Sequence, residues 1–102
     1  MKKYDVKLLS RAYDDLDDIY SHVARELAVP ETAKQLIDTL EDAILSLEQF
    51  PQRGSKRKTG AYARRGYRQL FVKNFVIVYR VEESEGRVLI VTVRNVKAKI
   101  GA

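Results

Sequence analysis

The sequence contains no cysteine and only one histidine, His22, among its 102 residues. Without cysteine the chain forms no disulfide, offers no thiolate to a metal ion and has no cysteine nucleophile. A single histidine excludes a metal site built from several histidines. No apolar run approaches the roughly 20 residues that span a bilayer, and no apolar signal segment follows Met1. We therefore expect one domain over residues 1–102, cytoplasmic, with no metal, no cofactor and no membrane contact.

Acidic residues are also missing from a long stretch in the second half of the chain. Residues 1–50 carry six basic and eleven acidic side chains, a net charge of −5, whereas residues 51–102 carry 13 and three, a net charge of +10. A basic surface of this kind typically meets a polyanion or an acidic partner, and the alternative is a solvated surface without a function. Nine bases and no acid lie between Glu48 and Glu82: Arg53, Lys56, Arg57, Lys58, Arg64, Arg65, Arg68, Lys73 and Arg80.

The first half of the chain predicts a strand and two helices. Residues 4–8 alternate apolar and polar side chains, as in a short half-buried strand. Ser10 can cap the helix that follows, in which apolar residues recur at spacings of three and four. Pro30 ends this helix and can open a second one, which Phe50 and Pro51 end. So short a link predicts an antiparallel helical hairpin. The polar face of the first helix, which we expect to lie in solvent, carries Asp14, Asp15, Asp17 and Asp18.

The second half predicts a loop over residues 51–66 and then three strands over 67–72, 75–81 and 87–93. Lys73-Asn74 fits a two-residue turn in which Asn74 tolerates positive φ. The middle strand is apolar almost throughout, so we expect it to be central and covered on both faces. The order β-α-α-β-β-β predicts an α+β fold, with the helical hairpin packed on an antiparallel sheet.

Few residues in this chain suggest catalysis. There is no phosphate-binding loop, no Ser/His/Asp set and no catalytic carboxylate pair, and His22 falls on the exposed side of its helix. Arginine and tyrosine together can pair with phosphates and stack on bases, which suits RNA. The candidates are therefore the loop bases, Tyr62 and the segment Gly66-Tyr67-Arg68, although Tyr67 can equally be a core residue with its hydroxyl at the rim. The tyrosines on apolar stripes, which we expect in the core, are Tyr4, Tyr20 and Tyr79.

Short motifs follow one another in a fixed order over residues 3–94. They are Leu8-Leu9-Ser10-Arg11-Ala12, Asp15-Leu16-Asp17-Asp18-Ile19, Pro30-Glu31-Thr32-Ala33, Leu47-Glu48-Gln49-Phe50-Pro51 with Gly54, Gly66-Tyr67-Arg68 and Val78-Tyr79-Arg80-Val81. In this order they resemble the RelE/ParE superfamily of bacterial toxins. The resemblance implies the toxin of a type II toxin–antitoxin pair. It also implies a cognate antitoxin that binds through a segment ordered on docking, in a hetero-oligomer.

The superfamily divides by target, and this chain matches one branch poorly. RelE-type members cut mRNA on the ribosome, with Lys and Arg around the second and third strands and a His or Tyr near the C-terminus. Arg68 matches one basic position, but Leu70 and Val76 stand at two others. The C-terminal segment, Arg94-Asn95-Val96-Lys97-Ala98-Lys99, contains no His or Tyr.

These departures favour a ParE-like toxin that inhibits DNA gyrase by binding. The alternatives are a RelE-like endoribonuclease, a basic nucleic-acid-binding module, and a member that has lost toxicity but still binds its antitoxin. In a nuclease, Arg68 and Tyr67 would be the catalytic residues. The residues that would contact RNA, another target or the antitoxin are Arg53, Lys56, Arg57, Lys58, Tyr62, Arg64, Arg65, Arg94 and Lys97.

Overall fold

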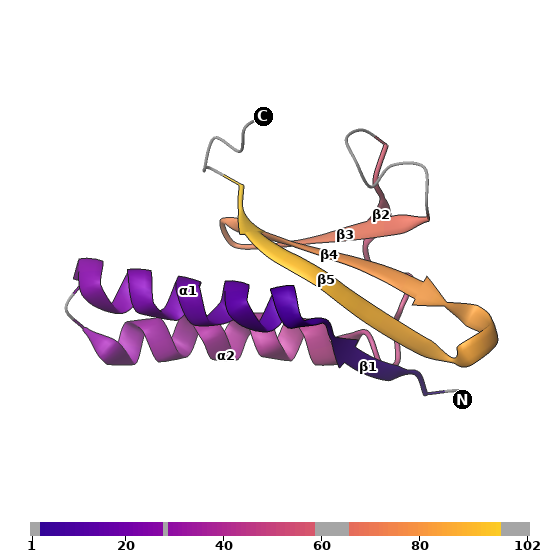
Figure 1. The fold of residues 1–102 in the computed structure, drawn as a ribbon, viewed down its shortest axis with the longest axis horizontal. Helices are drawn as coiled ribbons and strands as arrows, with labels where there is room; N and C mark the ends of the chain where they lie inside the picture. The colour runs from indigo at the N-terminus through magenta and orange to yellow at the C-terminus, as the bar shows by residue number, and fades with distance from the viewer. Residues whose placement is uncertain (1–2, 28, 59–65, 97–102) are drawn as a thin grey trace.

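The computed structural model describes residues 3–27, 29–58 and 66–96, and it confirms the α+β fold with a helical hairpin packed on a sheet (Figure 1). The elements follow in the order β1 (Asp5–Leu8), α1 (Ser10–Leu27), α2 (Pro30–Ser46), β2 (Ser55–Lys56), β3 (Tyr67–Val72), β4 (Phe75–Glu82), the 3-10 turn η2 (Glu83–Glu85) and β5 (Arg87–Asn95). Neither helix has an apolar stretch long enough to cross a membrane within the part of the chain that is described.

The five strands form one sheet in the order β1-β5-β4-β3-β2, which differs from the predicted antiparallel sheet in two respects. First, β1 pairs with β5 in parallel. Parallel strands need a long connection, and here the helical hairpin and the strands β2 to β4 lie between the two in the chain. Second, the stretch predicted as a loop contains the two-residue strand β2, in which Ser55 and Lys56 pair with Gln69 and Arg68 of β3. So short a strand lacks any periodicity in sequence, and only its pairing defines it.

The turn between β3 and β4 forms at the predicted residues, but its backbone differs from the expectation. Positive φ falls on Lys73, at 54°, and not on Asn74. A two-residue hairpin loop of the primed types requires positive φ at its first residue, which is Lys73 here. The position in the turn therefore decides which residue has positive φ, although asparagine tolerates positive φ better than lysine does.

Among the described residues, the helices and the sheet bury one apolar core. Leu40 and Leu47 of α2 and its C-terminal turn are fully buried, as are Ile77 and Tyr79 of β4. Burying one such side chain contributes roughly 1.5–3 kcal/mol.

β4 is the middle strand and all five residues Phe75–Tyr79 are buried, which confirms that β4 is central. The expected cover on both faces is not complete, because Phe75, Ile77 and Tyr79 belong to the core while Val76 and Val78 line an open cavity.

Tyr20, which we expected in the core, is 39% exposed. Its position in the second half of α1 explains the difference, because the far end of the hairpin extends beyond the sheet (Figure 1). Tyr79 is fully buried as predicted, and Tyr4 is partly buried against the core.

Asp15, which we expected in solvent, is bonded to the sheet. Its Oδ2 accepts hydrogen bonds from the Thr92 hydroxyl and from the Val93 N–H, the latter at 3.1 Å. The contact lies where β5 continues past the end of its parallel partner β1, so Asp15 supplies an acceptor that no described strand provides. One carboxylate thus fixes α1 against β5.

Asp15→Ala is expected to lower the free energy of unfolding by roughly 1–3 kcal/mol, because the fully buried Thr92 hydroxyl and the Val93 N–H lose their acceptor. Asp15→Asn keeps an acceptor oxygen and should lose less. Asp17→Ala, on the exposed part of the same helix, should stay within about 0.5 kcal/mol of the parent. Urea unfolding of the three variants checks this, and equal midpoints for Asp15→Ala and Asp17→Ala would contradict the role of the Asp15 contact.

Glu83 links three segments at the opposite end of the sheet. The Tyr4 hydroxyl donates to Glu83 Oε1 at 2.5 Å, and Gln52 Nε2 donates to Glu83 Oε2 at 2.9 Å. The hydrogen bond to Glu83 raises the pKa of Tyr4 above its ordinary value of 10.0.

Because the pKa of Tyr4 is higher in the folded protein, this contact stabilises the fold fully below pH 10. The stabilisation is lost as pH rises through the raised pKa. Tyr4→Phe should therefore unfold earlier than the parent at pH 8, and the gap between the two unfolding midpoints should shrink at alkaline pH. A gap that stays constant or widens at high pH would show that the Tyr4 hydroxyl is not titrating beside Glu83.

Candidate functional site

The loop after α2 is fixed to the sheet through the hydroxyl of Tyr79. This buried hydroxyl donates to the Pro51 carbonyl at 2.9 Å and accepts from the Gly54 N–H at 2.8 Å. A Cβ on Gly54 would lie 2.3 Å from the Gln69 carbonyl oxygen and 2.8 Å from the Tyr79 hydroxyl. The loop therefore passes so close to β3 and β4 that only glycine fits at position 54.

Arg68 holds the same loop from β3. Its Nε donates to the Gly54 carbonyl at 3.1 Å, and its Nη2 donates to the Gly54 and Gln52 carbonyls at 2.5 and 3.1 Å. The side chain is partly buried, and these bonds satisfy main-chain carbonyls that pair with no strand. Two of the three guanidinium nitrogens are thus committed to the fold.

Tyr67 lies on the other face of the sheet from Arg68. Successive residues of a strand point to opposite faces, and Tyr67 pairs in register with Arg80 whereas Arg68 pairs with the core residue Tyr79. The Arg80 guanidinium carbon lies 5.8 Å from the centre of the Tyr67 ring, a cation–π contact. The two residues that would be catalytic in a nuclease are therefore separated by the sheet.

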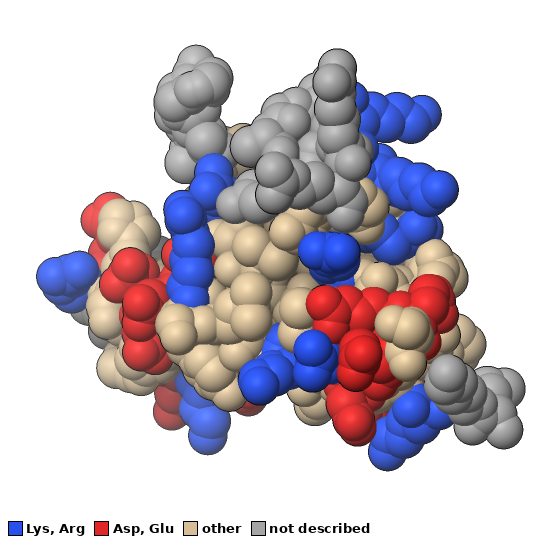
Figure 2. All heavy atoms as spheres, turned by 45° about the vertical axis from the view of Figure 1, so that its right-hand side comes forward, with Lys and Arg blue, Asp and Glu red and all other residues tan. Residues whose placement is uncertain are grey.

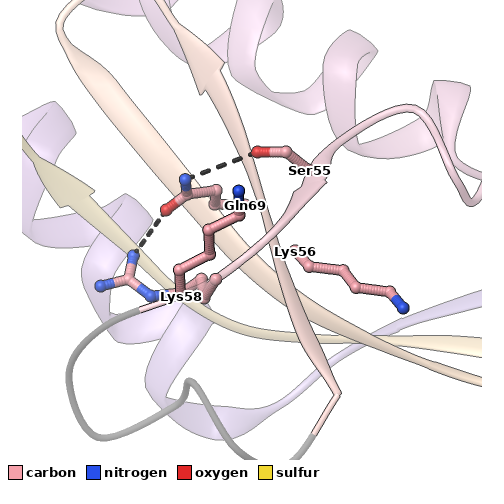
Figure 3. A pocket seen from close by; sticks show the side chains of 5 residues that line it. Ser55, Lys56, Lys58 and Gln69 are labelled. Carbon is pink, nitrogen blue, oxygen red and sulfur yellow. Dashed lines mark hydrogen bonds between the residues drawn. The ribbon is translucent and has the colours of Figure 1, made fainter.

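Lysines and arginine gather at the edge of the sheet formed by β2. Ser55, Lys56, Arg57, Lys58 and Gln69 line an open cavity of about 350 Å³ (Figure 3). Arg57 Nη1 donates to Gln69 Oε1 at 3.1 Å, and Gln69 Nε2 donates to Ser55 Oγ at 3.5 Å. Lys56 and Lys58 are exposed, and in Figure 3 their side chains point in different directions, with Lys58 directed toward Gln69. The edge is cationic and accessible to an anion.

A second cavity, of about 260 Å³, lies on the face of the sheet that points away from the helices. We call it the arginine groove, and its lining residues are Arg57, Gln69, Phe71, Val76, Val78, Arg94 and Val96. Val76 and Val78 form a buried floor, while Phe71 and Val96 are 58% and 41% exposed. The two arginines are among the binding residues predicted from the sequence, whereas the apolar lining residues are not. Residues two apart in a strand share a face, which places Gln69 with Phe71 and Val76 with Val78. Only the strand register brings these two pairs together.

The other predicted site residues are spread over the molecule. Arg53 is exposed, and its Nη1 donates to Ser46 Oγ at 2.7 Å. Four predicted residues lie outside the described residues: Tyr62, Arg64, Arg65 and Lys97. The basic half also contains an acidic region, because Glu82, Glu83 and Glu85 cluster where β4 joins β5. Figure 2 shows acidic side chains gathered in this region at the lower right, below the basic side chains of the upper right.

A strand, a helical hairpin and then the remaining strands of the same sheet is the order of elements that the resemblance to the RelE/ParE superfamily of toxins implies, and comparison with known families supports it. The family model described as "ParE toxin of type II toxin-antitoxin system, parDE" matches residues 6–98. The chain therefore belongs to the ParE toxin family of type II toxin–antitoxin systems.

Two solved structures have the same fold. A chain of the chromosomal ParDE toxin–antitoxin system from P. aeruginosa is 25% identical, with a TM-score of 0.76 over 92% of this chain and 97% of that one. A chain of the RelBE2 toxin–antitoxin complex from Mycobacterium tuberculosis is 21% identical, with a TM-score of 0.65 over 93% of each chain, and this likeness concerns the fold alone. No curated protein matches the chain in sequence.

Proposed function

We propose that this protein stops cell growth by binding DNA gyrase, that it cuts no RNA, and that a cognate antitoxin neutralises it in a cytoplasmic hetero-oligomer. The proposal rests on the hydrogen bonds of Arg68 and on the position of its neighbour Tyr67. The Arg68 guanidinium holds the carbonyls of Gln52 and Gly54, and its strand neighbour Tyr67 lies across the sheet. If Arg68 and Tyr67 were the catalytic residues of a nuclease, both side chains would have to reach the same phosphate group of the RNA.

The two other departures from the nuclease pattern support the same conclusion. Leu70 is 8% exposed and packs in the core, and Val76 is 6% exposed on the floor of the arginine groove. Attack by an RNA 2′-hydroxyl needs a base to take its proton and a cation to stabilise the charged transition state. The one histidine of the chain, His22, is exposed on α1 and does not line either of the two sheet cavities.

A RelE-like endoribonuclease remains the second candidate, because Lys56 and Lys58 make the β2 edge able to hold RNA phosphates. The two candidates differ in what they require of these lysines. Gyrase binding as proposed here needs no phosphate contact at β2, whereas RNA cleavage does.

The test is a supercoiling assay with purified gyrase and relaxed plasmid, run beside a translation reaction on a defined mRNA. We expect the purified toxin to block supercoiling, purified antitoxin to restore it, and the mRNA to stay intact by primer extension. Normal supercoiling at large toxin excess would overturn the proposal.

Cuts at codon positions that disappear in the variant with both Lys56→Ala and Lys58→Ala would establish the second candidate instead. Salt-sensitive binding of any nucleic acid, with neither effect, would indicate a basic binding module.

A further inference from the structure

A small cavity of about 220 Å³ opens on the helical hairpin, at the end where β1 lies beside the start of α1 and the end of α2 (Figure 1). We call it the hairpin pocket, and its lining residues are Leu8, Tyr13, Glu41, Ile44 and Leu45. It shares no lining residue with the cavity at the β2 edge or with the arginine groove. Its volume is below the roughly 300–1,000 Å³ of small-molecule sites, so it suits a side chain of a protein partner.

Large apolar side chains are exposed at this pocket. Tyr13 is 59% exposed and Leu45 is 53% exposed, whereas Ile44 between the helices and the pocket is buried. Leu9, which is 36% exposed, precedes Tyr13 by four residues, and its carbonyl accepts the Tyr13 N–H at 3.2 Å, so it extends the apolar surface by one turn. Exposed apolar groups within a polar rim are typical of protein-interaction sites, and tyrosine is one of the residues that contribute most binding energy there.

Acidic side chains form the rim of the hairpin pocket. Asp17 follows Tyr13 by four residues, and Glu41 and Asp42 precede Leu45 by four and three, so each acid neighbours an exposed apolar residue on its helix. All three acids are exposed. Together α1 and α2 carry nine acidic and three basic side chains, a net charge of −6, and none of the three bases lies three or four residues from Tyr13 or Leu45. The pocket is therefore complementary to a partner surface that is both apolar and basic.

We propose that the toxin docks on gyrase through the hairpin pocket, and that the gyrase segment seated there carries an apolar side chain flanked by lysine or arginine. This inference rests on the gyrase binding named in the proposed function. The apolar side chain packs against Tyr13 and Leu45, and the flanking cations reach the carboxylates of the rim. Burial of the apolar side chain supplies most of the affinity, whereas the opposite charges speed the encounter and select the partner.

Other occupants of the hairpin pocket fit less well. The carboxylates of the rim repel DNA, RNA and the kind of acidic segment that the basic β2 edge would attract from an antitoxin. A second copy that docks through the same patch would place two acidic rims against each other. A second copy that offers its basic β2 edge instead would form a head-to-tail contact, which builds rings or open chains.

The experiment measures the affinity of the fluorescently labelled toxin for purified gyrase by anisotropy. The variant with both Tyr13→Ala and Leu45→Ala loses the exposed apolar contacts and should bind roughly tenfold or more weakly than the parent. The control variant with both Phe50→Ala and Val29→Ala also loses one aromatic and one aliphatic side chain, which are 59% and 47% exposed. Because neither residue lines the hairpin pocket, this control should bind within about twofold of the parent.

A second pair of variants tests the acidic rim. The variant with both Glu41→Gln and Asp42→Asn should bind roughly threefold or more weakly at low salt, and its affinity should depend less on salt than that of the parent. The control variant with both Glu26→Gln and Asp18→Asn removes the same charge from exposed positions of the hairpin that lie outside the rim. It should keep the salt dependence of the parent.

Gyrase binding that the Tyr13/Leu45 variant keeps at full strength would overturn this inference and leave the proposed function standing. A parent toxin that does not bind gyrase would overturn both, so the two failures are distinguishable. If the same variant keeps gyrase binding but loses purified antitoxin, the pocket belongs to the antitoxin, and if it loses only self-association in sedimentation, the pocket belongs to a second copy. Either result would contradict the inference. Matching circular dichroism and unfolding midpoints confirm that the variants are folded.

Discussion

Gly54→Ala is expected to destabilise the protein by about 3 kcal/mol, because its Cβ would lie 2.3 Å from the Gln69 carbonyl oxygen. The obstructing atom belongs to the backbone of β3, so no rotamer change relieves the contact. Moving the loop away would break the Gly54 N–H bond to Tyr79 and the Arg68 bonds to Gly54. For a domain of this size the melting temperature should fall by roughly 12–24 °C.

Gly66→Ala is the matched control for this prediction. Gly66 has φ of +75° and no atom within 4 Å of its would-be Cβ, so alanine there should cost only the roughly 1–2 kcal/mol of a left-handed backbone. Thermal melts of the two variants compare the destabilisation caused by a steric clash, at position 54, with that caused by an unfavourable backbone conformation, at position 66. A Gly54→Ala melting temperature at or above that of Gly66→Ala would contradict the close packing of the loop.

Tyr79→Phe is expected to lower the free energy of unfolding by roughly 2–4 kcal/mol, although it removes a single oxygen atom. That oxygen bonds both the Pro51 carbonyl and the Gly54 N–H, and all three residues are buried, so both main-chain groups lose their partner. Denaturant unfolding measures the loss.

The control for Tyr79→Phe is Tyr13→Phe, at a tyrosine that is 59% exposed and should change stability by no more than about 0.5 kcal/mol. If the two variants unfold at the same denaturant concentration, the Tyr79 hydroxyl does not fix the loop. The doubly substituted Gly54→Ala, Tyr79→Phe protein should lose less than the sum of the two changes, because phenylalanine removes one of the atoms that the alanine Cβ would meet.

Local patterns were enough to predict the helices and most strand boundaries. α2 begins at Pro30, β3 spans Tyr67–Val72, and β4 and β5 start at Phe75 and Arg87, all as the sequence indicated. These features depend on hydrophobic periodicity, turns and proline, which are properties of neighbouring residues. The strand conformation of residues 67–72 and 75–79 could thus be predicted from these residues alone.

The features that the sequence did not reveal depend on residues far apart in the chain. The parallel pairing of β1 with β5, the two-residue β2 and the Asp15 contact each join segments that only the folded chain brings together. Tyr20 fits the apolar stripe of α1, and only the length of the hairpin beyond the sheet exposes it.

The candidate site divides in the same way. The basic residues of the β2 edge and Arg94 could be identified from charge alone. Their hydrogen-bond partners and neighbouring side chains could not. Arg68 donates to carbonyls of a loop 14 and 16 residues away in sequence, which no pattern near Arg68 indicates. The separation of Tyr67 from Arg68 follows from strand alternation, so it could have been inferred as soon as residues 67–72 were assigned to a strand.

The most direct test of gyrase inhibition without RNA cleavage is made on one culture induced for the toxin alone. Plasmid topology and primer extension on an abundant mRNA are measured from the same cells at the same times. We predict that the plasmid loses negative supercoiling as growth stops, while the transcript keeps its full length and shows no new ends at codon positions. Codon-positioned ends on the transcript with unchanged plasmid topology would contradict the account.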